Sequence, residues 1–178
     1  MSTKILGHYV HPILIVLPLG ALTTSVIFDI VHLFTSNPEH ARVAYWTMLV
    51  GIFGGVAAAP FGIVDWLGVP SGTRAKRVGL SHALATSGMM VLFIASWLLR
   101  GSAPGEPSAT AVTLSFLGMA TGAVGGWLGG ELVERLGIGV DRDAHVNAPS
   151  SLSGREARES AASTPPGGDF MSTQKPAH

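Results

Sequence analysis

Two histidines stand near the start of apolar segments, and they are the first candidates for chemistry. His11 precedes Pro12 at the start of one apolar segment, and His82 lies about one helical turn inside another. An ionisable residue at membrane depth is costly, so each is a candidate for a functional role. Imidazole is a natural axial ligand of haem iron. We therefore expect His11 and His82 to ligate a haem b between their helices, for electron transfer.

Charged residues near these histidines extend the candidate site. Arg74 and Arg77 precede His82 in a basic loop, where they would meet the haem propionates. Tracing antiparallel helices across a bilayer places three further polar residues at the same end. These additional candidates are His8, Asp65 and Glu131.

Two other interpretations of this cluster stay open. In one, His82 with Asp65 or Glu131 binds a divalent ion or relays protons, as carboxylate and histidine chains do in pumps. The chain would then be a small ion or proton transporter. In the other, these groups only hydrogen-bond one another and nearby backbone, and the chain is a non-catalytic membrane subunit. The sequence has no glycine-rich phosphate loop and no nucleophile elbow, so the balance is against an enzyme.

Four apolar segments must position these residues. They cover about residues 12–34, 43–67, 78–99 and 110–130. Each is long enough to cross a bilayer, which takes about 18 or more apolar residues. The connections are short, so consecutive helices should be antiparallel neighbours. The sequence therefore predicts an all-α fold, an integral membrane four-helix up-down bundle over residues 1–140 with the lipid bilayer around it.

The C-terminal region has a different composition. Residues 1–137 carry 13 charged side chains, whereas the 38 residues of 141–178 carry nine. Few apolar residues remain there to be buried, so residues 141–178 are predicted to be a disordered polar tail. The chain has no cysteine and a formal net charge of zero. This composition excludes disulfides, iron–sulfur clusters and covalent haem attachment, and it argues against a nucleic acid as partner.

The distribution of basic residues predicts the orientation in the membrane. One side has Lys4, Arg74, Lys76, Arg77, Arg135 and Arg142, and the opposite side has Arg42 and Arg100. The positive-inside rule therefore places both termini in the cytoplasm. Asp29 and His32 lie three residues apart on one helix face near the opposite side, and we expect them to pair.

Small residues at regular spacing predict how the helices meet. Glycines recur every four residues in the fourth segment, at Gly118, Gly122, Gly126 and Gly130, and the second segment has a similar pattern. Such stripes let two backbones approach closely. We expect them mainly to pack helices within the chain, and on other faces to bind a second copy or subunits of a redox complex. On this basis Gly126→Leu should disrupt the domain more than Ala123→Leu.

A weak internal repeat links the two halves. His11 opens the first apolar segment and His82 the third, while Trp-Leu-Gly recurs at residues 66–68 and 127–129. The pattern predicts two related hairpins in which the two histidines hold equivalent positions.

Three segments together resemble one known family. They are GHYVHPILIVLPLG at residues 7–20, SGTRAKRVGLSHAL at 71–84, and GWLGGELV at 126–133 with GIGV at 137–140. Over about residues 5–150 the chain resembles the bacterial membrane family called domain of unknown function 2231.

The resemblance implies a four-helix domain of the bacterial inner membrane, with no established activity. Relatives that carry the domain beside cytochrome-like modules make a redox role an expectation by association. The family's polar motif positions correspond to His8, His11, His82 and Glu131. This chain has Tyr9 where many members have proline, and Leu17 where many have an aromatic residue.

Overall fold

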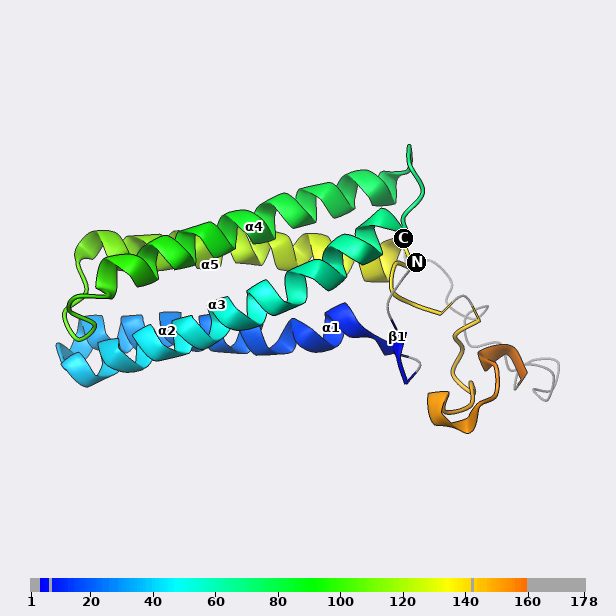
Figure 1. Ribbon diagram of the computed structural model, residues 1–178, viewed down its shortest axis with the longest axis horizontal. Helices are drawn as coiled ribbons and strands as arrows, with labels where there is room; N and C mark the ends of the chain where they lie inside the picture. The colour runs from blue at the N-terminus through cyan, green and yellow to red at the C-terminus, as the bar shows by residue number, and fades with distance from the viewer. Residues whose placement is uncertain (1–3, 7, 142, 160–178) are drawn as a thin grey trace, which may run out of the picture.

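The computed structural model describes residues 4–6, 8–141 and 143–159. Its main elements are helices that run the length of the molecule (Figure 1). In order they are α1 (Val10–Leu14), α2 (Val16–Thr35), α3 (Pro38–Leu67), α4 (Arg74–Arg100) and α5 (Ala109–Gly130), followed by a π-helical turn, η1 (Glu131–Arg135). Four helical segments, with α1 and α2 taken as one, are long and apolar enough to cross a membrane. The predicted all-α membrane bundle is confirmed.

Side-chain caps set where three of the helices begin. The side chain of Asn37 accepts a hydrogen bond from the backbone of Glu39 at the start of α3, next to Pro38 in the first turn. Thr73 and Ser108 cap α4 and α5 in the same way. Such residues satisfy backbone N–H groups that have no partner within the helix. The helices therefore begin one to five residues before the apolar segments do.

A short break separates α1 from α2 near the N-terminus. Pro18 has no N–H to donate to the carbonyl of Leu14, and α1 ends at Leu14. Before α1, two strands of two residues each, β1 (Lys4–Ile5) and β2 (His8–Tyr9), pair antiparallel. This small hairpin is an addition to the predicted helices.

The described part of the region after the helices contains turns, a 3-10 helix, η2 (Ser151–Ser153), and a second 3-10 turn at residues 157–159. In this region Arg155 and Glu159 form an exposed ion pair, with 2.9 Å between Nε and Oε2. The hydrogen bond from Arg155 lowers the pKa of the Glu159 carboxyl below its usual value. The rest of the tail predicted to be disordered, residues 160–178, lies outside the described residues.

The helices form two hairpins that point the same way. Hairpin 1 comprises α1, α2 and α3, and hairpin 2 comprises α4 and α5. The α2–α3 and α4–α5 connections lie at one end of the molecule, while β1, η1 and the α3–α4 connection lie at the other (Figure 1). Between the hairpins, Leu22, Val26 and Met48 pack with Phe93 in the core. Many other apolar side chains are exposed, as expected for surfaces that face lipid.

The glycines of α5 divide into two sets with different surroundings. A Cβ added at any of four of them would touch a side chain of α4, and these are Gly118, Gly122, Gly125 and Gly129. At Gly126 and Gly130 an added Cβ would meet nothing within 4 Å. The prediction that Gly126 lies on the packed stripe is therefore wrong. An α-helix has 3.6 residues per turn, so the packed path advances by four, three and four residues rather than by a constant four.

Candidate functional site

His11 lies in α1 and is held against α3. Its Nδ1 is 3.2 Å from the carbonyl oxygen of Ala58. A carbonyl can only accept, so Nδ1 carries the proton and donates it in this hydrogen bond. The ring also lies close to Gly62, where an added Cβ would come within 2.9 Å of Cε1. Glycine at this position is what allows the imidazole to fit against the helix.

His82 has the same arrangement in the second hairpin. Its Nδ1 lies 2.8 Å from the carbonyl oxygen of Gly125 in α5. An added Cβ at Gly129 would be 3.3 Å from Cε1 of its ring. In both histidines the hydrogen bond from Nδ1 fixes the tautomer and leaves the lone pair on Nε2, the orientation that ligating histidines use.

The two hairpins can be aligned through these contacts. The first helices match at a separation of 71 positions, which relates His11 to His82 and Leu22 to Phe93. The second helices match at a separation of 67 positions. This separation relates the residue whose carbonyl binds His11 to the residue whose carbonyl binds His82. It also relates the glycine beside the first ring to the glycine beside the second. A further pair of contacts agrees with both separations. Leu22 packs against Gly51 in hairpin 1, and the corresponding Phe93 packs against the corresponding Gly118 in hairpin 2.

This alignment confirms that the two histidines are equivalent in fold position. It also corrects the predicted match of the Trp-Leu-Gly segments. At a separation of 67, Trp66 corresponds to Val133 and not to Trp127. The contacts between neighbouring helices define the alignment, and under that alignment the two Trp-Leu-Gly segments occupy different positions along their helices.

Among the residues that the structure describes, the hydrogen bonds and ion pairs of the other candidate residues do not involve the two histidines. Glu131 forms an ion pair with Arg74, with 2.5 Å between Oε1 and Nη2. His8 is exposed in β2, where its Nδ1 lies 3.2 Å from the carbonyl of Leu6. Arg77 is exposed on α4. In the described part of the chain, the hydrogen-bond partners of His11 and His82 are backbone carbonyls, neither Asp65 nor Glu131.

Asp65 lies instead beside a cavity of about 450 Å³ near the end of α3. The cavity is also lined by Tyr9, by residues 68–70 and by residues 137–141. The Oδ1 atom of Asp65 is buried, and no hydrogen-bond partner for it lies among the described residues. Within those same residues no group of three or more His, Asp or Glu side chains could hold a metal ion.

A buried ion pair joins the two hairpins at the opposite end of the bundle. Arg100, the last residue of α4, donates from Nη1 to Oδ1 of Asp29 on α2 over 2.6 Å. It also donates from Nη2 to Oδ2 over 2.8 Å. Both side chains are completely buried. This bidentate geometry is the strongest form of a pair between arginine and carboxylate.

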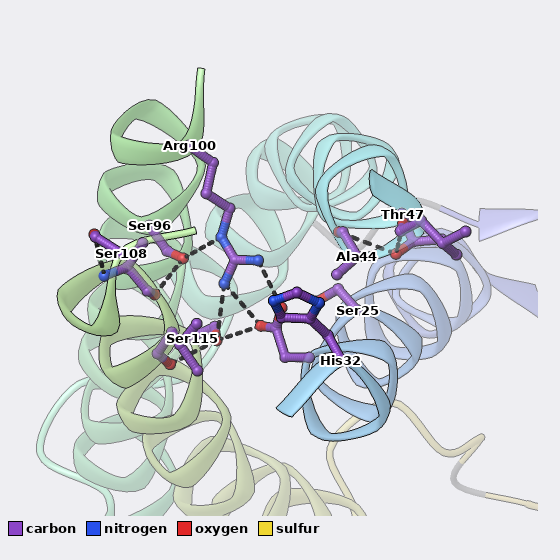
Figure 2. Close-up of polar contacts among 12 residues, drawn as sticks. Ser25, His32, Ala44, Thr47, Ser96, Arg100, Ser108 and Ser115 are labelled. Atoms are coloured by element: carbon purple, nitrogen blue, oxygen red, sulfur yellow. Dashed lines mark hydrogen bonds and ion pairs between the residues drawn. The ribbon is translucent and has the colours of Figure 1, made fainter. Parts of the chain in front are cut away.

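Two buried serines complete this network (Figure 2). Ser115 of α5 donates to Oδ2 of Asp29 over 2.7 Å. Ser96, one turn before Arg100, accepts from Nε over 3.3 Å and donates to the carbonyl of Ala111 over 2.6 Å. The network therefore connects α2, α4 and α5. Its groups are paired with one another and shielded from solvent, so it can fix the helices relative to one another.

The structure contradicts the sequence predictions for both Asp29 and Arg100. Asp29 pairs with Arg100, whereas Nδ1 of His32 lies 2.9 Å from the carbonyl of Asn37. The count of basic residues predicts that Arg100 lies at the membrane surface, but its side chain is fully buried. The sequence did contain an indication that Asp29 and Arg100 occupy equivalent positions in the two halves. Asp29 follows His11 by 18 residues, and Arg100 follows His82 by 18 residues.

A family model described as "Predicted membrane protein (DUF2231)" matches residues 7–142. Neither the curated proteins nor the solved structures contain a significant match.

Proposed function

Since the chain belongs to the family of predicted membrane proteins DUF2231, we propose that its four-helix domain binds a haem b through His11 and His82 and takes part in electron transfer. The observation that carries the proposal is the equivalence of the two histidines. Each comes from the first helix of its hairpin, and each has its Nδ1 on a carbonyl of the second helix.

The tautomer of both rings supports a role as ligands. With the proton held at Nδ1, the lone pair at Nε2 is available to a metal at the end of the bundle that holds both histidines. His11 and His82 would each supply an imidazole nitrogen to one haem iron, and that iron would supply one-electron redox chemistry when bound. Arg77, exposed in the turn before His82, would take a propionate, because Arg74 is already bound to Glu131.

The visible spectrum of the protein tests this proposal. Protein expressed with sufficient haem supply and purified in detergent should show sharp bands on reduction, typical of two histidine ligands. His82→Ala should abolish these bands, because one of the two nitrogens that would hold the iron is lost. His8→Ala should retain them, because His8 is exposed in β2. A colourless wild-type preparation would refute the proposal, as would full retention of the bands in His82→Ala.

A second candidate is a non-catalytic membrane subunit. It is favoured by the internal pairing of charges in the bundle, Asp29 with Arg100 and Glu131 with Arg74. Charges that are already paired within the bundle need no ligand to neutralise them. This candidate predicts colourless wild-type protein, and so the same spectrum distinguishes it from the first.

We further propose that the domain lies in the bacterial inner membrane with both termini in the cytoplasm. Burial removes Arg100 from the count of surface charges, so Arg42 is the basic residue left at the α2–α3 and α4–α5 end. Six basic residues remain on the other side, and short loops rich in Lys and Arg stay inside. A reporter active only in the cytoplasm, fused after His178, should give signal. Signal from a periplasmic reporter instead would reverse the orientation.

A further inference from the structure

We propose that the Asp29–Arg100 pair makes the docking of the two hairpins selective, so that hairpin 1 binds hairpin 2 and not a second hairpin 1. The partner that fits the inner face of each hairpin is thus the unlike hairpin, from the same chain or from another copy. The proposal concerns assembly and is independent of any ligand at the histidines.

The first step is the position of the two charges in the repeat. Asp29 and Arg100 are separated by 71 positions, the same separation that relates His11 to His82. They are therefore equivalent residues of the two hairpins. Equivalent residues that touch each other must lie near the axis that relates the halves. Both hairpins run in the same direction, so this axis runs along the membrane normal.

The second step is what this axis implies for wrong pairings. Two copies of hairpin 1 docked in the same way would bring Asp29 against Asp29. Two copies of hairpin 2 would bring Arg100 against Arg100. Either arrangement buries two like charges where the observed pair has 0% exposed side chains. A buried charge without its partner is strongly unfavourable, so like hairpins are rejected.

The third step is that the contacts outside this buried polar network do not discriminate in this way. Around the pair the hairpins meet through apolar side chains, including the equivalent residues Leu22 and Phe93. Apolar packing is non-directional and tolerates alternative partners. In helical assemblies a single buried polar position can fix the choice of partner that apolar contacts leave open.

Co-expression of two full-length copies with different affinity tags tests the proposal. In Asp29→Leu/Arg100→Met the pair is replaced by apolar side chains, an exchange that buried ion pairs often tolerate. This variant should stay folded, and co-purification of the two tags should rise several-fold above the wild-type level. In Asp29→Arg/Arg100→Asp the charges are exchanged, and co-purification should stay at the wild-type level.

A second measurement uses the two single variants. Asp29→Arg carries two arginines at the axis and Arg100→Asp carries two aspartates, so each alone should be recovered poorly. Expressed together, they should be recovered as a one-to-one complex in which hairpins are exchanged between chains. Co-purification at the wild-type level in the apolar variant would overturn the proposal. Full recovery of the single variants as separate species would overturn it as well.

Discussion

Replacing Arg100 by methionine is expected to destabilise the bundle by about 3–5 kcal/mol, the usual cost of breaking a buried ion pair. The side chain of Asp29 is 0% exposed and accepts two hydrogen bonds from Arg100, one at each carboxylate oxygen. Without the guanidinium, its carboxylate keeps one bond, from Ser115. The thermal midpoint in detergent should fall markedly below that of the wild type.

Arg77→Met provides the matched control, because it makes the same substitution on the same helix at an exposed position. Surface changes of this kind stay within about 0.5 kcal/mol. The double variant Asp29→Leu/Arg100→Met should recover much of the loss, since it leaves no unpaired charge. Equal midpoints for Arg100→Met and Arg77→Met would contradict the importance of the buried pair.

Replacing Gly125 by leucine is expected to destabilise the bundle by about 1–3 kcal/mol or more through overpacking. A Cβ at this position would already come within 2.9 Å of Cγ2 of Thr86 on α4. The carbonyl of Gly125 also accepts the hydrogen bond from His82. Separation of α4 from α5 would therefore disturb the packing of hairpin 2 and the position of His82 together.

Gly126→Leu provides the adjacent control on the same helix. Nothing lies within 4 Å of an added Cβ there, so the side chain would point away from the bundle. Leucine also has a higher helix propensity than glycine, by somewhat less than about 1 kcal/mol. The thermal midpoint of Gly126→Leu should stay near that of the wild type. An equal loss in both variants would place the outer glycines of α5 against a second copy.

The buried pair and the histidines lie at opposite ends of one framework. The pair connects α2 of hairpin 1 to α4 and α5 of hairpin 2. Each histidine, by contrast, is bonded within its own hairpin. The relative placement of His11 and His82 therefore depends on how the hairpins dock, and the Asp29–Arg100 network is a main polar determinant of that docking.

The sequence by itself determined the number of long apolar helices, their approximate positions and their antiparallel order. These properties belong to single segments: about 18 apolar residues span a bilayer, and in lipid the backbone must satisfy its own hydrogen bonds as helix. The equivalence of His11 and His82 could also be inferred, because both stand near the start of the first helix of a hairpin. The family was recognisable from its motifs over most of the same residues.

Only the tertiary structure decided which polar groups meet. Asp29 and Arg100 are 71 positions apart, and their contact depends on how each helix is rotated about its axis and how the hairpins dock. The same holds for the carbonyl partners of the histidines, for the bond between Glu131 and Arg74, and for the choice of Gly125 over Gly126 as the packed residue. Hydropathy predicts that a helix lies in the membrane. Because these helices are apolar on nearly every face, hydropathy does not predict which face turns toward the other helices.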